Sequence, residues 1–434
     1  MSKSPVRTTP SSRRRAIWGW AIYDFANSAY TTLIVTFIYA VYFTQQIAPD
    51  GITGTALWSR GVTITALVVA FVSPVMGALA DRGGLRRPLL LGLTLLTVVS
   101  VSLLWFPTPG EVALALTLFV ISNVAFELSG VLYNSYLPEV AEPHAIGRVS
   151  GFGWSLGYVG GLVAMAIALF GFIQPEVPPF GLDPQTGEHV RATTVLVGVW
   201  FAVLSIPMFL WVKEPEAAAA RRPLGEVTRR AFAELGETLR EVRRYRQVVR
   251  LLLARLFYND GLVTIFAFGP IFAAEVFGFT TIEVLYWGLA LNVTAGLGAF
   301  AMGFLDDRIG GRLTLLVTLV GLVAASLWAV ASNSKESLYL AGIFLGIFVG
   351  PNQAASRSLL GRFAPADKEG EFFGFFAFSG KAMAFAGPLL LGLVTQITGD
   401  ARMGMATILG FFFIGGALLL WVDEEEGRRT AAGL

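Results

Sequence analysis

Five ionisable side chains interrupt stretches of sequence that are otherwise apolar. They are three acids, Asp24, Glu127 and Asp260, and two bases, Arg255 and Lys381. A charged side chain at the centre of a membrane-spanning helix costs about 2.5–3.5 kcal/mol on insertion scales. We therefore expect these groups to face protein or water, where an acid can bind a proton or an amine and a base can bind a carboxylate.

Four of these charges fall at one predicted depth. Asp24, Glu127, Asp260 and Lys381 each lie nine or ten residues from the inner end of the apolar stretch that holds them. That separation is roughly 14–15 Å at 1.5 Å per helical residue, close to the middle of a hydrocarbon core about 30 Å thick. Four helices are thus predicted to bring charge to one level.

Two interpretations of this layer stay open. The charges can pair permanently and lock the helices together, as buried ion pairs do. Three acids against two bases leave at least one acid without a base, however, and desolvation favours the protonated form of an acid. In the second interpretation one of Asp24, Glu127 or Asp260 binds and releases a proton, with Asp24 the first candidate. Lys381 then attracts a substrate carboxylate.

The charges lie on polar stripes at helical spacing, which predicts that they share helix faces. Asp24 lies with Tyr23 and Asn27 on one such stripe, and Asp260 follows Asn259. The candidate binding and coupling residues are Tyr23, Asp24, Asn27, Glu127, Tyr158, Asn259, Asp260, Asn292, Gln353 and Lys381.

The composition is that of a membrane protein. The chain has 434 residues, of which 55% are hydrophobic and only 14% charged, with mean hydropathy +0.65; soluble domains are near a quarter charged. It has no cysteine, and its two histidines, His144 and His189, are far apart in the sequence. We therefore expect no metal site and no cofactor. The apolar stretch after the basic start lacks a small-residue cleavage site and is expected to remain in the membrane.

Twelve stretches are long enough to cross a bilayer as helices, which needs about 20 apolar residues each. The sequence thus predicts an all-α membrane protein of twelve spans. The stretches are 16–47, 61–80, 88–110, 112–138, 149–175, 192–212, 251–274, 284–305, 313–334, 337–356, 372–399 and 403–422.

Lysine and arginine predict the orientation. With the N-terminus inside, 26 of the 32 basic residues fall on the cytoplasmic side, four fall outside and two lie within spans, and cytoplasmic loops are the ones rich in Lys and Arg. Both termini are therefore predicted to be cytoplasmic, which in a bacterium means the plasma membrane. The predicted segments are a tail (1–15), a six-helix bundle (16–212), a linker (213–250), a second six-helix bundle (251–422) and a tail (423–434).

The linker carries an apolar period of three to four residues, typical of an amphipathic helix. The periodic residues are Leu224, Val227, Ala231, Leu235, Leu239 and Val242. Such a helix can be solvated, or it can lie on the inner leaflet with its basic face toward anionic headgroups. Both interpretations remain open.

The second bundle repeats the first. The segment from Gly77 to Arg86 returns from Gly303 to Arg312, and every matched position lies 226 residues later (303 − 77). Because six helices separate the copies, both have the same orientation, which makes a parallel repeat. Transporters built from repeats bind substrate near the midplane between them.

This Gly-x-Leu-x-Asp-Arg-x-Gly loop resembles the signature loop of the major facilitator superfamily, with Leu85 as a departure in the first copy. The resemblance implies the major facilitator fold. It also implies that Asp81 caps or pairs at a helix end between the halves and stabilises one access state; the alternative is a turn that only sets topology. The candidate gating residues are Asp81, Arg82, Arg86, Arg148, Asp307, Arg308, Arg312 and Arg357.

Further segments resemble the vacuole-effluxer-like branch of that superfamily. They are 20–29, 126–139, 146–158, 353–358 and 371–381, and the similarity extends over about residues 16–422. The fungal members of this branch export amino acids from the vacuole during autophagy. The resemblance therefore implies a secondary active transporter of a small polar, amino-acid-like solute that works by alternating access.

Other classes of function are also compatible with the sequence. The solute can instead be a sugar, nucleoside, peptide or drug-like compound, and a non-transporting receptor or scaffold can keep the same fold. No nucleotide-binding glycine loop and no His or Cys cluster is present, which argues against an enzyme. The expected partners are a small-molecule substrate, protons and the lipid bilayer, without nucleic acid, and we expect a monomer.

Overall fold

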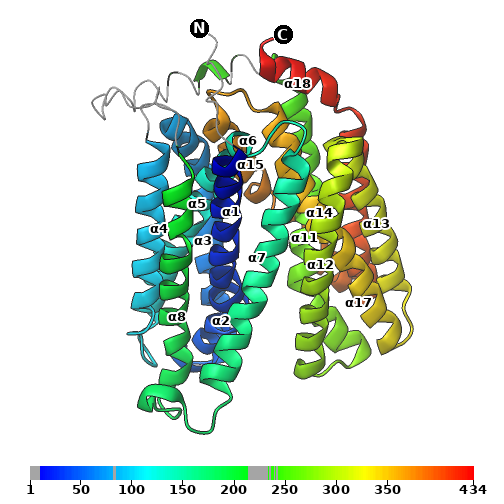
Figure 1. Ribbon diagram of the computed structural model, residues 1–434. Helices are drawn as coiled ribbons and strands as arrows, with labels where there is room; N and C mark the ends of the chain where they lie inside the picture. Colours follow the sequence, from blue (N-terminus) through cyan, green and yellow to red (C-terminus); the bar gives the residue numbers. More distant parts are fainter. Residues whose placement is uncertain (1–9, 82–84, 214–232, 234–235, 239, 241–242) are drawn as a thin grey trace. The chain divides into compact units, whose positions relative to one another are not determined.

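A computed structural model describes residues 10–434 apart from 82–84, 214–232, 234–235, 239 and 241–242 (Figure 1). The predicted linker helix and Arg82 lie outside the described residues. Among the described residues, twelve helical segments are long and apolar enough to cross a membrane, which confirms the predicted all-α, twelve-span fold. They are Ser11–Ile47, Gly51–Asp81, Arg86–Leu103, Val112–Val140, Ile146–Ile173, Glu188–Trp211, Arg246–Phe277, Ile282–Ile309, Gly311–Ala331, Lys335–Phe363, Glu369–Thr398 and Ala401–Leu420.

The chain divides into two compact units. The first comprises Met1–Tyr136 and Leu156–Phe232, and the second comprises Leu137–Ser155 and Ala233–Leu434. The start of the fifth span therefore packs with the second unit, although it lies among the first six spans in the sequence.

The first unit is built around its first span. Its elements are α1 (Pro10–Ala29), η1 (Tyr30–Phe37), α2 (Tyr39–Tyr42), η2 (Phe43–Ile47), α3 (Gly51–Asp81), α4 (Arg86–Leu103), α5 (Val112–Ser135), the later part of α7 (Ile146–Ala168), η3 (Leu169–Ile173), η4 (Pro179–Gly181), α8 (Glu188–Leu204) and α9 (Ile206–Trp211). α1 packs on α8 and α9, while α4 packs on α5 and α8. Stacked rings of Trp20, Tyr23 and Tyr133 join α1 to α5.

The second unit is built on paired long helices. Its elements are α6 (Leu137–Val140), the first part of α7, α11 (Arg246–Phe277), α12 (Thr281–Ile309), α13 (Gly311–Ala331), α14 (Lys335–Phe363), α15 (Glu369–Lys381), α16 (Ala386–Thr398), α17 (Ala401–Leu420) and α18 (Glu424–Ala432). α14 packs against α12 and α13, and α17 packs against α11, α13 and α16.

Glycines let α7 approach α12 at backbone contact. A Cβ on Gly151 would lie 2.3 Å from the Ala299 carbonyl oxygen and 3.1 Å from the Gly303 Cα, and a Cβ on Gly303 would lie 3.0 Å from the Arg148 Cα. Small residues permit such close crossings between membrane helices. The crossing holds the start of α7 on the second unit.

We predict that Gly151→Ala lowers the unfolding temperature of the detergent-purified protein, because forcing a methyl group into packed backbone costs about 1–3 kcal/mol. Gly288→Ala is the matched control, since it lies on α12 with nothing within 4 Å of its added Cβ. The control should leave stability unchanged or raise it by up to about 1 kcal/mol. Equal unfolding temperatures for Gly151→Ala and wild type would contradict the close crossing.

Candidate functional site

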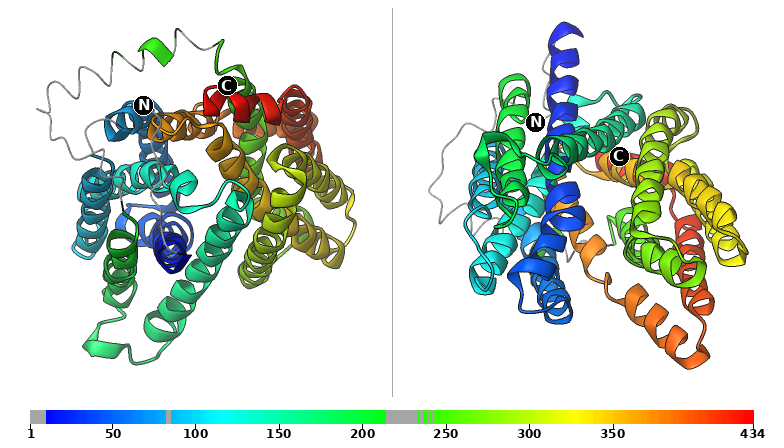
Figure 2. Two further views of the ribbon diagram at one scale, coloured as in Figure 1. Left: turned by 45° about the horizontal axis from the view of Figure 1, so that its top comes forward. Right: turned by 90° about the horizontal axis from the view of Figure 1, so that it is seen from below.

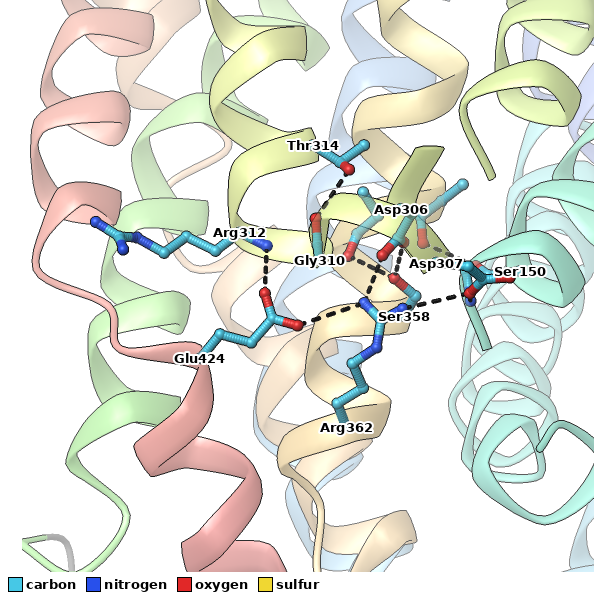
Figure 3. A network of polar contacts seen from close by, with 12 residues as sticks. Ser150, Asp306, Asp307, Gly310, Arg312, Thr314, Ser358, Arg362 and Glu424 are labelled. Atoms are coloured by element: carbon cyan, nitrogen blue, oxygen red, sulfur yellow. Dashed lines mark hydrogen bonds and ion pairs between the residues drawn. The ribbon is translucent and has the colours of Figure 1, made fainter. Parts of the chain in front are cut away.

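A buried charge cluster lies where α12 ends and α14 ends, at the side that the sequence predicts to be cytoplasmic (Figure 3). The Arg362 guanidinium forms an ion pair with Asp306, lies 3.5 Å from Asp307 and lies 3.8 Å from Glu424 of α18. The Arg362 and Asp306 side chains are 5% and 2% exposed. One guanidinium thus holds three carboxylates, and Ser358 donates a further hydrogen bond to Asp306.

Asp307 connects this cluster to the start of α7. Its two carboxylate oxygens accept the backbone N–H groups of Gly147 at 2.8 Å and Arg148 at 3.2 Å, and the Arg148 Nε lies 3.6 Å from Oδ2. A carboxylate at the first N–H groups of a helix satisfies donors that have no partner within the helix. A Cβ on Gly147 would lie 2.6 Å from the Asp306 Cγ, so only glycine fits there.

Arg357 provides a second contact to α7, one turn further along. Its Nε donates to the Ser150 hydroxyl at 3.0 Å and its Nη2 donates to the Ser150 carbonyl at 2.7 Å. The guanidinium also lies over the Trp154 ring, 5.5 Å from its centroid. The Arg357 residue is 3% exposed, so it lies within the protein and not at the headgroups.

The C-terminal helix α18 docks on the same cluster. Glu424 accepts the Arg312 backbone N–H at 2.9 Å, at the start of α13, and Gln247 donates to Glu426 at 2.8 Å. The Arg246 guanidinium beside Glu426 holds the pKa of that carboxyl below its usual range. The docked helix is therefore favoured near neutral pH and loses this contribution when acid protonates the carboxyl.

The first copy of the repeated loop makes a different contact. Arg86 donates to Asp81 at 2.8 Å, with both side chains buried, and stacks over the Tyr136 ring at 5.2 Å. Arg308, in the second copy, is exposed. The gating roles of the loop residues stay predictions, although the structure gathers Arg148, Asp307 and Arg312 around one cluster.

In the first unit, polar side chains of α1 meet α7 and α4. Tyr23 is buried and its hydroxyl shares a hydrogen bond with Thr94 of α4 at 2.8 Å. A Cβ on Gly157 of α7 would lie 3.7 Å from the Asp24 Cγ, and Asp24 interacts electrostatically with Tyr158. The Asp24, Asn27, Glu127 and Tyr158 side chains are all half-buried. The structure thus brings Asp24 and Tyr158 together at one helix contact.

In the second unit, the eleventh span is interrupted. α15 ends at Lys381 and α16 begins at Ala386 (Figure 2), and residues 382–385 between them form turns, so the regular helical hydrogen-bond pattern is broken there. Side chains of α11 form hydrogen bonds with the backbone on either side of this interruption. Asn259 donates to the Gly380 carbonyl at 3.1 Å, and Asp260 Oδ2 accepts the Gly387 N–H at 2.8 Å. Breaks in spanning helices occur where other groups satisfy the backbone.

The remaining candidates are spread over the second unit. Asn292 donates to the Gly288 carbonyl of its own helix at 2.8 Å, while Gln353 and Lys381 are half-buried. Their roles in binding stay predictions.

Sequence reasoning missed several members of the charge cluster, namely Asp306, Ser358, Arg362 and Glu424. Two signals point to them. The second loop copy carries a double aspartate where the first has Ala-Asp, and Arg362 follows Arg357 at the end of the tenth span. Arg255 was noticed as an intramembrane charge but was not assigned a role.

Solved structures of the same fold come from the major facilitator superfamily. The proton:xylose symporter XylE superposes with TM-score 0.74 at 13% identity over 97% of this chain and 98% of that one. The human organic anion transporter MFSD10 gives TM-score 0.71 at 16% identity over 95% and 100%. The twelve-span chain therefore has the major facilitator fold, which is a transporter fold.

The sequence narrows this class to one family. The model of the family described as "Vacuole effluxer Atg22 like" matches residues 51–432, and the chain belongs to that family. An uncharacterized MFS-type transporter from Bacillus subtilis, YxiO, is 26% identical over 94% of both chains. Autophagy-related protein 22-1 from Penicillium rubens is 23% identical over 86% of this chain and 76% of the relative. The protein is thus an integral multi-pass membrane transporter of the major facilitator superfamily and not an enzyme.

We predict that Asp307→Asn releases the start of α7 from the charge cluster. Hydrogen bonds to a charged group contribute about 1.5–3 kcal/mol each, and the neutral amide retains part of this. In a cysteine-free chain, Val149→Cys reports the release, because Val149 is 5% exposed. Its labelling by a water-soluble maleimide should accelerate roughly tenfold, which corresponds to about 1.4 kcal/mol.

Glu425→Gln is the control, because Glu425 is a 75% exposed acid of α18 whose ion-pair partner among the described residues is Arg429 of the same helix. Labelling of Val149→Cys should be unchanged by this substitution. If Asp307→Asn also leaves the rate unchanged, Asp307 does not hold α7.

Proposed function

We propose that this transporter is a secondary active carrier that moves a small polar, amino-acid-like solute, coupled to protons, by alternating access. One observation carries the proposal: Asp24, Glu127 and Lys381 lie deep within apolar spans and yet are half-buried and not sealed in the core. Ionisable groups at that depth mark ion and substrate pathways in membrane proteins.

The descriptions of similar proteins support the same proposal. One family is described as a vacuole effluxer, one relative as an MFS-type transporter, and one structural neighbour as a proton:xylose symporter. Carboxylates and a lysine together suit a solute with charges of both signs, which favours an amino acid over a sugar.

Asp24 is the acid that we propose for proton coupling. It is half-buried and lies beside Gly157 and Tyr158 of α7, so a change of its charge acts directly on a helix contact. Asp260 is 1% exposed and already accepts a backbone N–H, which suits a structural role better.

The charge cluster supports the proposed gating. Asp307 bonds to the start of α7, which follows the first four spans in the sequence but packs within the second unit. We propose that this contact exists in one arrangement of the two predicted bundles and is lost in the other. A ligand shifts such an equilibrium by its difference in affinity for the two arrangements. We further propose that bundles 16–212 and 251–422 move about the linker 213–250, and that the excess of basic residues keeps both termini in the cytoplasm.

The proposal is tested by reconstituting the purified protein into liposomes. A thermal-shift screen against amino acids, sugars, nucleosides and peptides selects a solute, and its uptake is then measured with and without a pH gradient. The proposal expects an amino acid to raise the unfolding temperature and to accumulate only with the gradient. Absence of any stabilising or transported solute would overturn it.

We predict that Asp24→Asn abolishes gradient-driven accumulation and leaves solute exchange partly intact, because the amide binds no proton but preserves the side-chain shape. Asp400→Asn is the matched control, since Asp400 is an exposed cap of α17 whose side chain accepts the Arg402 N–H, a role that asparagine also fills. Unchanged accumulation in Asp24→Asn would exclude Asp24 as the coupling group.

A further inference from the structure

Arg255 is a cation inside the seventh span for which the described residues supply no carboxylate partner. Arg255 lies on α11, five residues after Arg250, and is half-buried. Over the described parts of the chain, no acid lies within ion-pair distance of its guanidinium, and its polar contacts are those to α15. A charged side chain within a spanning helix is costly unless it pairs or faces water, by up to about 2.5–3.5 kcal/mol at the helix centre, so this arginine calls for an explanation.

The guanidinium is fixed in place by α15. Its Nη1 donates to the Phe376 carbonyl at 2.7 Å and to the Ser379 hydroxyl at 3.1 Å. Its Cζ lies 3.6 Å from the centroid of the Phe376 ring, which is within the range of a cation–π interaction. A Cβ on Gly380 would lie 2.6 Å from Nη1, so a methyl group added there would displace the guanidinium. The described residues thus position the charge without supplying a counter-charge.

Only one of the three guanidinium nitrogens is used in these contacts. Nη2 and Nε donate to none of the residues that the structure describes, and neither is among the fully buried polar atoms without a partner. Both nitrogens therefore keep some exposed surface. Arginine presents its donors as a planar fork that matches a carboxylate with two parallel hydrogen bonds.

A purely structural role does not account for an arginine here. Asn259, one turn further along α11, holds the same interrupted span by donating to the Gly380 carbonyl, and it does so without charge. A neutral donor would likewise serve the Phe376 carbonyl. What the arginine adds is a positive charge with unused donors.

We propose that Arg255 binds the carboxylate of the transported solute. This inference rests on the proposed transport function and assigns a residue to recognition of the solute's anionic group. The contacts with α15 preorganise the guanidinium, which lowers the entropic cost of binding. The bound carboxylate supplies the counter-charge that the described part of the protein lacks.

The test compares L-amino acids with the matching amino acid amides, which differ in the loss of the carboxylate charge. Binding is measured by calorimetry on the full-length protein in detergent, for wild type, Arg255→Gln and Arg255→Lys. We expect wild type to bind each amino acid more tightly than its amide. Arg255→Gln should lose that preference and bind the amino acid about tenfold to a hundredfold more weakly, which is the range expected for hydrogen bonds to a charged group. Arg255→Lys should retain part of the preference, because it keeps the charge but not the fork.

A second pair of variants tests the positioning without removing the charge. Gly380→Ala should displace the guanidinium and weaken amino acid binding, whereas Gly392→Ala, in the same span with nothing within 4 Å of its added Cβ, should not. This pair decides the matter if Arg255→Gln does not fold.

The outcomes separate this inference from the proposed function. In one outcome, wild type binds and transports an amino acid, but neither the Arg255 variants nor Gly380→Ala change the affinity for that amino acid or the preference over its amide. That result overturns the inference while the proposed transport function stands. If wild type binds a neutral sugar or nucleoside and no carboxylate compound, the inference is likewise overturned. If wild type binds and transports no solute, the proposed function fails first and the inference with it.

Discussion

The hydrocarbon core of a membrane offers no water to polar groups. This constraint explains the contacts of the interrupted eleventh span and those of the charge cluster around Arg362. Every backbone amide and every charge within a span must find a partner inside the protein. The interrupted eleventh span shows how this is done: Arg255, Asn259 and Asp260 of α11 each bond to the backbone of α15 or α16. Asp260 Oδ1 is fully buried and has no hydrogen-bond partner among the described residues, a cost that the Gly387 contact helps to offset.

The same constraint operates differently at the predicted cytoplasmic side. There Arg362 lies among Asp306, Asp307 and Glu424 (Figure 3), and Asp307 accepts a backbone hydrogen bond from the start of α7. Removing one partner of a buried ion pair costs more than the pair contributes. Such a cluster therefore favours discrete arrangements over gradual adjustment, which is what a carrier with alternating access requires.

The sequence predicts the spans, the repeat and the family because these depend on hydrophobic length and on a motif that recurs in register. The interrupted eleventh span was not predicted, since the residues 382–385 between its helices are ordinary helix formers and its partners are backbone atoms. The packing of Leu137–Ser155 with the second unit was also missed, because it depends on glycines at a crossing and not on a change of composition. The roles assigned to Asp24, Glu127 and Lys381 remain predictions.

We propose that the Asp307 contact controls alternating access, and spin-label distances test this directly in this cysteine-free chain. One label pair is placed at the exposed Leu91 of α4 and Leu313 of α13, near the starts of spans predicted to begin on the cytoplasmic side. The other pair is placed at the exposed Ile52 of α3 and Ile282 of α12, near the starts of spans predicted to begin on the outer side. Addition of a transported solute should shift the two distance distributions in opposite directions, and Asp307→Asn should lengthen the Leu91–Leu313 distances. Distributions that stay unchanged, or that shift in the same direction, would contradict the account.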